Sequence, residues 1–123
     1  MSNLFKGYTS FDKALTCWNV RQVVNMGSMF EGATSYNQAL RTWNPVNVKN
    51  MTRMFYGAAK FNQQLCRFHW VIPSTPTSGV TDMFQGSGCF FQSDPTEFHP
   101  VGTWANVNIP PFCQDCSIYN GLV

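Results

Sequence analysis

Large apolar side chains recur along this chain at a regular spacing. Phe5, Phe30 and Phe55 follow one another at equal intervals, and Phe84 comes after a slightly longer one. The segments that carry them read almost alike, as in MFEGATSYNQAL and MFYGAAKFNQQL. One such segment cannot bury its own apolar face, whereas stacked segments can. We therefore expect the repeated positions to form one core: Phe5, Phe30, Phe55, Phe84, Met26, Met51, Met29, Met54, Met83, Trp18, Trp43, Leu15, Leu40 and Leu65.

The spacing inside each unit is that of one face of an α-helix. From Val48 to Ala58, apolar residues return at about every third or fourth position, which predicts a short helix. Asn47 and Ser78 are placed to cap two of these helices. Residues 43–48, WNPVNV, alternate in part and predict a short extended segment. The sequence thus predicts an α/β repeat solenoid that is leucine-rich-repeat-like, because such units span about 20 to 29 residues. A small helical bundle is the alternative fold.

The same register divides the chain into units. Three units of about 4–28, 29–53 and 54–82 are followed by a partial unit, 83–91. The cluster IPSTPTSG reads as a loop that absorbs the extra residues before Phe84. The register is lost after Phe90, so we expect residues 92–123 to form an irregular C-terminal cap or contact tail. Asp12, Asn37 and Asn62 recur after the second aromatic position, where we expect them to satisfy backbone groups inside each coil.

Two stretches carry a family resemblance, VVNMGSMFEGATSYNQALRTWN and VKNMTRMFYGAAKFNQQL. Over about residues 4 to 91 the chain resembles the mycoplasma-type 25-residue repeat family of unknown function, also known as BspA-like leucine-rich-repeat surface proteins. The resemblance implies a leucine-rich-repeat-like solenoid, a surface or adhesive role, and an extracellular, cell-surface or virion location. It implies no catalytic residues and no cofactor. The chain departs from the pattern in its few copies, its lack of a visible leader peptide and its tail with IPPFCQDC.

Composition and charge narrow the functional classes. The chain is 44% hydrophobic and 11% charged, which excludes disorder, because disordered chains combine low hydrophobicity with high charge. No apolar run approaches the ~18 residues of a membrane-spanning helix. All Lys and Arg side chains lie between Lys6 and Arg67, so that residues 1–67 carry a net charge of +6, whereas residues 68–123 carry −4. In a linear stack, this distribution makes one end basic and the other acidic.

Cysteine and histidine are the only candidates for site chemistry. Five cysteines leave at least one thiol unpaired within the chain. The C-x-x-H and C-x-x-C spacings would suit a zinc site if the tail folds back on the third unit, with the ligands Cys66, His69, Cys113 and Cys116. Disulfides, a redox C-x-x-C pair and buried free thiols are the other interpretations, and free thiols are favoured. No nucleophile, paired-carboxylate or phosphate-binding motif is present, so we expect neither an enzyme nor a cofactor.

These observations favour a non-enzymatic structural or interaction protein. The first unit begins at Leu4 without a polar cap before it, and stacks of repeats normally need such caps. We expect head-to-tail self-assembly or docking in a larger surface assembly such as a filament, envelope or virion, through Leu4, Phe5, Trp70, Trp104 and Phe112. The alternative is an adhesion module whose repeated exposed positions recognise a protein or glycan. Nucleic-acid binding is not expected, because the aromatic residues occupy core positions.

Overall fold

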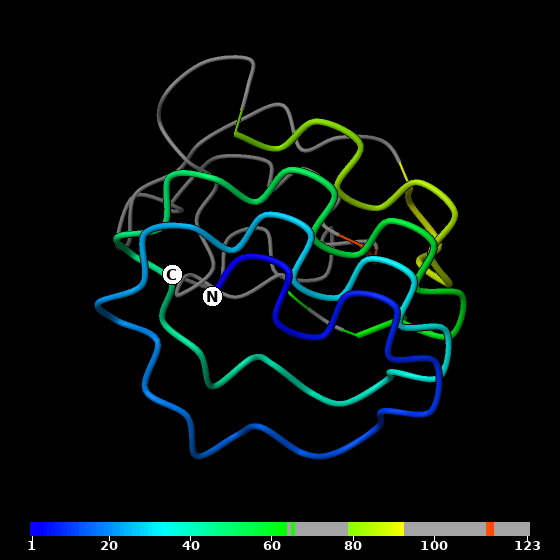
Figure 1. Cartoon of the computed structure of the whole chain (residues 1–123), viewed down its shortest axis with the longest axis horizontal. Helices are drawn as coiled ribbons and strands as arrows, with labels where there is room; N and C mark the ends of the chain where they lie inside the picture. The colour runs from blue at the N-terminus through cyan, green and yellow to red at the C-terminus, as the bar shows by residue number, and fades with distance from the viewer. Residues whose placement is uncertain (64, 66–78, 93–112, 115–123) are drawn as a thin grey trace, which may run out of the picture.

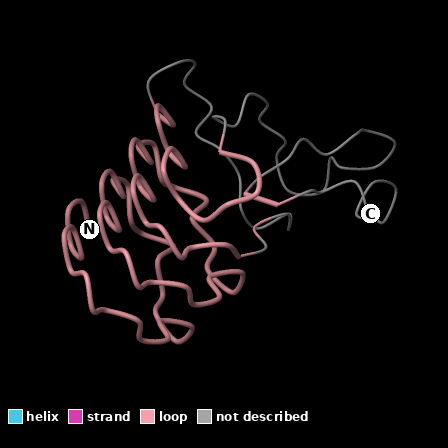
Figure 2. Ribbon diagram, turned by 90° about the vertical axis from the view of Figure 1, so that its right-hand side faces the viewer, coloured by secondary structure: helices cyan, strands magenta, loops and turns pink. Residues whose placement is uncertain are grey.

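The computed structural model describes residues 1–63, 65, 79–92 and 113–114. Over these residues the chain winds into four coils that lie side by side, with the N-terminus in the coil at one end (Figure 1, Figure 2). We define the first coil as residues 1–24, the second as 25–49, the third as residues 50–63 and 65, and the fourth as 79–92. The described residues contain no helix, and their β-structure is confined to isolated bridge residues such as the parallel pair Asn25 and Asn50.

The predicted α/β, leucine-rich-repeat-like solenoid is therefore wrong. The segment from Val48 to Ala58 forms consecutive turns instead of a helix. Residues 43–48 do not form an extended segment, because the Val48 N–H donates to the Pro45 carbonyl over 3.1 Å and closes a turn. Asn47 caps no helix, and its Nδ2 instead donates to the carbonyl of Arg21 in the first coil over 2.6 Å. Ser78, the other expected cap, lies outside the described residues.

Backbone hydrogen bonds in the second coil alternate between two directions. The even-numbered N–H groups from 26 to 32 donate to carbonyls of the third coil over 2.8 to 2.9 Å. The odd-numbered ones from 29 to 33 donate three residues back within their own coil, over 3.0 to 3.3 Å. Gly27 completes the set, since its N–H donates to Asn25 Oδ1 over 2.8 Å. Every N–H from 26 to 33 is thus satisfied without a helix or a sheet, as buried backbone requires.

The turns of each coil repeat every four residues, which explains the helix-like spacing. In the second coil, Ser28 and Gly32 have positive φ, 55° and 71°, at the third position of successive turns. Positive φ at this position is the mark of a type II turn. The buried hydrophobic side chains of these turns, Met26, Met29 and Phe30, fall at i, i+3 and i+4. An α-helix has the same spacing, so the pattern of apolar residues cannot distinguish the two.

The core is a set of columns that run through the coils. Thirteen of the fourteen expected core residues are buried, and Trp18 is the exception. Phe5, Phe30, Phe55 and Phe84 form one column, with ring centroids 5.5 to 5.7 Å apart and nearly parallel planes. A second column contains Tyr36 between the rings of its neighbouring coils, at 5.5 and 6.2 Å. Stacked rings stabilise a fold by more than the apolar area that they bury. Aromatic residues therefore recur because each ring packs against the equivalent ring of the neighbouring coil.

Trp18 is a correction to the expected core. Its side chain is 41% exposed, whereas Trp43, the same position one coil later, is 1% exposed. Trp43 Nε1 also donates to the Leu15 carbonyl of the coil before it, over 2.8 Å. Trp18 lies in the coil at the N-terminal end of the stack, so no described coil covers it on that side (Figure 2).

A polar ladder joins the coils outside the core. The Asn37 N–H donates to Asp12 Oδ1 over 2.9 Å, and the Asn62 N–H donates to Asn37 Oδ1 over 3.0 Å. The Nε2 groups of Gln38 and Gln63 donate to the same two oxygens, over 3.0 and 2.8 Å. The expected bonds from Asp12 and Asn37 to backbone groups therefore exist, but they join neighbouring coils instead of satisfying groups inside one coil.

Two residues of the tail supply the next rung of this ladder. Gln114 Nε2 donates to the carbonyl and the Oδ1 of Asn62, each over 3.2 Å, as Gln63 does to Asn37. A disulfide joins Cys113 to Cys89 of the fourth coil, and the Phe91 N–H donates to the Cys113 carbonyl over 3.0 Å. Most of the predicted tail, residues 92–123, lies outside the described residues.

Candidate functional site

The N-terminal end of the stack presents unpaired backbone acceptors. Between the first two coils, the N–H groups of residues 3, 5 and 7 donate to the carbonyls of residues 27, 29 and 31. At the same repeat positions in the first coil, the equivalent carbonyls are those of Ser2, Leu4 and Lys6. No group among the described residues donates to these three carbonyls. They form a row at alternate residues, comparable to the unpaired edge of a sheet.

Apolar side chains surround this row. Leu4 is 40% exposed and Tyr8 57% exposed, and Trp18 lies on the same end coil. Phe5 is buried, but its ring has a stacked partner in another coil on one side only, Phe30 at 5.5 Å. The end coil thus combines unpaired acceptors with partly exposed apolar surface, and such patches mark interaction sites.

The ladder is also open at this end. Asp12 uses its side chain and its carbonyl toward the second coil. The Asp12 N–H has no partner among the described residues, although the same group of Asn37 and of Asn62 is bonded. Lys13 follows Asp12 at the position of Gln38 and Gln63, and it is an exposed cationic donor. The end coil therefore offers one backbone donor and one charged donor beside its row of acceptors.

The fourth coil offers the complementary groups. The Asp82 N–H occupies the position from which Ser28 and Arg53 donate to the following coil, and within the described residues it has no partner. The Gly86 N–H occupies the position of the Gly32 and Gly57 N–H groups, which donate to the following coil over 2.8 Å. Its acceptor is instead the side chain of Gln92, whose Oε1 lies 3.1 Å away.

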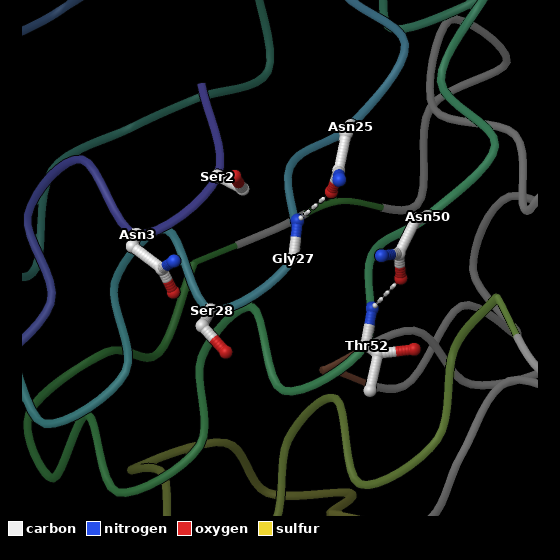
Figure 3. Close-up of a pocket in the computed structure, with 7 residues that line it drawn as sticks. All are labelled: Ser2, Asn3, Asn25, Gly27, Ser28, Asn50 and Thr52. Carbon is white, nitrogen blue, oxygen red and sulfur yellow. Dashed lines mark hydrogen bonds between the residues drawn. The ribbon is translucent and has the colours of Figure 1, made fainter.

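A groove crosses the first three coils on the turn side (Figure 3). Its volume is about 250 Å³, and its lining is neutral and polar: Ser2, Asn3, Asn25, Gly27, Ser28, Asn50 and Thr52. The carboxamides of Asn25 and Asn50 hold the turns, since their Oδ1 atoms accept from the N–H groups of Gly27 and Thr52 over 2.8 and 2.9 Å. A side chain at Gly27 would lie 2.9 Å from Asn50 Nδ2. The polar lining is thus explained largely by the turns that it stabilises.

Charged side chains connect the coils beside this groove. Glu31 lies 3.7 Å from Lys6 Nζ of the first coil and 3.7 Å from an Arg53 nitrogen of the third coil. The Arg53 guanidinium also lies 4.2 Å from the centre of the Tyr56 ring. The Glu31 side chain is only 15% exposed, whereas those of Lys6 and Arg53 are 51% and 44% exposed. Pairs with one solvent-exposed partner contribute little to stability, about 0 to 1 kcal/mol each, but these two pairs connect the first three coils.

The structure places few of the predicted site residues together. Of the four zinc candidates, Cys113 is bonded to Cys89, and Cys66, His69 and Cys116 lie outside the described residues. The favoured interpretation, buried free thiols, is wrong for Cys89 and Cys113, which are buried but form a disulfide, and for Cys17, which is free but exposed. The described residues contain no group of three or more His, Cys, Asp or Glu that could hold a metal ion.

The predicted interface residues are divided between the end coil and segments that the structure does not describe. Leu4 and Phe5 lie in the first coil at the open end, whereas Trp70, Trp104 and Phe112 lie outside the described residues. Within the described part of the chain, no helix is long and apolar enough to cross a membrane.

The family comparison identifies the repeat. The family model of the Mycoplasma protein of unknown function, DUF285, matches residues 1–98. The chain belongs to this family. The resemblance of the two repeated stretches to the mycoplasma-type repeat family of unknown function is thereby confirmed. The description of DUF285 gives no activity or partner, and neither the curated proteins nor the solved structures gave a match.

Sequence reasoning missed several groups that the DUF285 fold brings to its two ends. The unpaired carbonyls of the first coil leave no trace in residue type, because every residue has a carbonyl. Asp82 and Gln92 could have been found by extending the repeat register. Asp82 follows Arg53 by the same number of residues as Phe84 follows Phe55, and both Arg53 and Asp82 have positive φ. Gln92 follows Gln63 by this number too, so it occupies the repeat position of the ladder glutamines.

Proposed function

We propose that this DUF285 chain is a non-enzymatic structural protein that assembles head to tail with further copies of itself. The observation that carries the proposal is the row of carbonyls at Ser2, Leu4 and Lys6, which have no donor among the residues that the structure describes. Inside the stack, the carbonyls at the same register positions all accept from the coil before them. The group that fits this row is therefore the N–H side of another coil of the same repeat.

The direction of the hydrogen bonds selects one arrangement of copies. Each coil donates its turn N–H groups toward the C-terminal end of the stack. Two N-terminal ends facing each other would place carbonyls opposite carbonyls, which cannot bond. An N-terminal end facing a fourth coil places acceptors opposite donors such as the Asp82 N–H. Contacts of this kind close into rings or continue as filaments.

Charge and apolar surface support the same arrangement. In the described fourth coil Asp82 is the only charged residue, whereas the first coil has a net positive charge, so this contact brings opposite charges together and two first coils repel each other. In the first coil, Lys6 and Lys13 are both exposed. Leu4, Tyr8 and Trp18 would lose exposed apolar surface in the contact, which contributes roughly 25 cal/mol per Å².

Light scattering after gel filtration, over a range of concentrations and ionic strengths, tests this proposal. We expect a mass that grows with concentration and falls as salt screens the two ends. A Leu4→Arg variant should remain monomeric, because it places a bulky cation in the apolar contact. Val46→Arg is the matched control, since Val46 is 46% exposed but lies in the second coil, and it should assemble normally.

Two results would reject the proposal. One is a chain that stays monomeric at all concentrations in both redox states. The other is an assembly that Leu4→Arg and Val46→Arg weaken equally, because the contact would then not lie at the N-terminal end.

A further inference from the structure

The fourth coil carries a feature that the three coils before it lack. At the repeated glycine, the N–H groups of Gly7, Gly32 and Gly57 all donate to a backbone carbonyl of the next coil over 2.8 Å. At Gly86 the acceptor is the side chain of Gln92, with Oε1 3.1 Å from the nitrogen. Gln92 thus occupies the place that the Lys6 carbonyl of a second copy would take in the proposed contact.

We infer that Gln92 is a gate on head-to-tail assembly, held closed by the Cys89–Cys113 disulfide. This inference rests on the proposed function and adds its regulation. The interaction surface is the donor edge of the fourth coil, and its partner is the first coil of a second copy. Phe84, which lies between Asp82 and Gly86 on this edge, has partners of its own, so the proposal concerns the other two N–H groups. While Gln92 covers Gly86, the edge offers the Asp82 N–H but not the Gly86 N–H.

Several contacts fix Gln92 in this position. Its Oε1 accepts from Gly86, and its Nε2 donates to the Ser87 carbonyl over 2.9 Å. The residue before it, Phe91, donates its N–H to the Cys113 carbonyl over 3.0 Å. Cys113 is in turn joined to Cys89, three residues before Gln92 in the chain. The disulfide therefore anchors the segment that positions the gate.

The rest of the anchor lies on the third coil. Gln114 bonds to Asn62 at two atoms, which places Cys113 against the stack with 1% of its surface exposed. Gln92 itself is exposed, so its two hydrogen bonds alone are weak, about 1 kcal/mol each. Cys89 is also held by its N–H, which donates to Ser87 Oγ over 3.1 Å. Beyond it, the contacts found in the described part of the chain are the two Gln92 bonds and the bond from the Phe91 N–H to the Cys113 carbonyl, which depends on the disulfide. Once the disulfide is reduced, a backbone carbonyl of a second copy can replace the Gln92 side chain.

Opening the gate is a disulfide reduction. A dithiol reductant attacks the Cys89–Cys113 bond, first forming a mixed disulfide and releasing one cysteine thiol. The second thiol of the reductant then displaces the other cysteine. The protein gains two electrons and two protons as two S–H groups, and the reductant becomes a cyclic disulfide. The chain would thus stay gated in an oxidising environment and assemble in a reducing one.

Two kinds of variant test the gate by light scattering. Gln92→Ala removes the gate and keeps the disulfide, so the result of this test does not depend on whether the reduced chain folds correctly. We expect it to assemble without reductant at a concentration about three- to tenfold lower than the wild type requires, the equivalent of about 1 kcal/mol. Gln63→Ala is the matched control, because it removes glutamine hydrogen bonds inside the stack and should leave assembly unchanged.

The redox arm uses the double variant Cys89→Ser and Cys113→Ser, with Cys17→Ser as the control at a free exposed thiol. We expect the double variant to assemble without reductant, as the wild type does with dithiothreitol. If wild type and Gln92→Ala assemble equally, and Leu4→Arg still blocks both, the gate is overturned while the proposed function stands. If neither Gln92→Ala nor the reduced wild type assembles, both are overturned.

Discussion

Trp43 and Trp18 occupy the same repeat position, and their difference gives a quantitative test of the stack. We compare Trp43→Phe with Trp18→Phe. In the second coil, Trp43 is 1% exposed and donates Nε1 to the Leu15 carbonyl over 2.8 Å. In the first coil, Trp18 is 41% exposed, and within the described residues its Nε1 has no acceptor.

The expected cost of Trp43→Phe follows from these contacts. The Leu15 carbonyl is not left bare, because it also accepts from the Trp18 N–H over 3.1 Å. The loss is therefore one net hydrogen bond, about 1 kcal/mol. The smaller ring also leaves a void in a packed site, which costs about 1 to 2 kcal/mol. Together these give about 2 to 3 kcal/mol, whereas Trp18→Phe should cost about 1 kcal/mol or less.

Urea unfolding followed by far-ultraviolet circular dichroism measures both variants. The chain should be dilute and at high ionic strength, so that the contact between copies does not bury Trp18. We expect a larger fall in the midpoint for Trp43→Phe at an unchanged slope. Equal losses, or a larger loss at Trp18, would mean that the first coil is not the end of the stack.

Three further predictions concern single contacts. Tyr36→Phe should stabilise the fold by up to about 1 kcal/mol, because the buried Tyr36 hydroxyl has no hydrogen-bond partner in the described part of the chain. Burial and, to a smaller extent, Asp12 raise the pKa of Tyr36 above its ordinary value of 10.0. Thermal melts at alkaline pH should therefore show that the wild type loses stability as the pH rises beyond that value and that the variant loses less. Gly57→Ala should cost about 1 to 2 kcal/mol in urea unfolding, because φ is 68° there and the nearest atom to an added Cβ, Gly32 Cα, is 3.9 Å away, so the cost is conformational; a Gly57→Asn variant that loses as much would contradict this. Removing the Cys89–Cys113 bond, which spans 24 residues, should lower stability by about 3 kcal/mol, and an unchanged melting temperature after reduction would contradict this contribution.

The sequence predicts which residues are buried better than it predicts the shape of the backbone. Phe30 and Phe55 contact each other because equal side chains at equal register must stack, whatever the local winding. The predicted helix is wrong because a four-residue winding of turns buries the same positions as a helix does. Gly32 and Gly57 indicate turns, but Ser28 and Arg53 adopt positive φ without being glycine, and residue type alone does not reveal this.

The two ends of the stack were predictable only in part. Exposed Leu4 and the uneven charge pointed to the N-terminal end, yet the acceptor row consists of backbone carbonyls that no residue type encodes. Cys89 and Cys113 have no spacing that distinguishes a disulfide from free thiols. The rung formed by Cys113 and Gln114 depends on a long return of the chain to Asn62, which no local pattern specifies.

Zero-length carbodiimide cross-linking of a mixed ¹⁴N and ¹⁵N sample tests the central claim, head-to-tail contact between copies, most directly. The isotope mixture separates links between copies from links within one chain by mass spectrometry. The link between Lys6 and Glu31, whose charged atoms lie 3.7 Å apart, should form within one chain and serves as the internal control. The account predicts mixed-isotope links between Lys6 or Lys13 of one copy and Asp82 of another under reducing conditions. If the control forms in the concentrated, reduced sample, but mixed-isotope links are missing or scattered over all exposed lysines, head-to-tail assembly is contradicted.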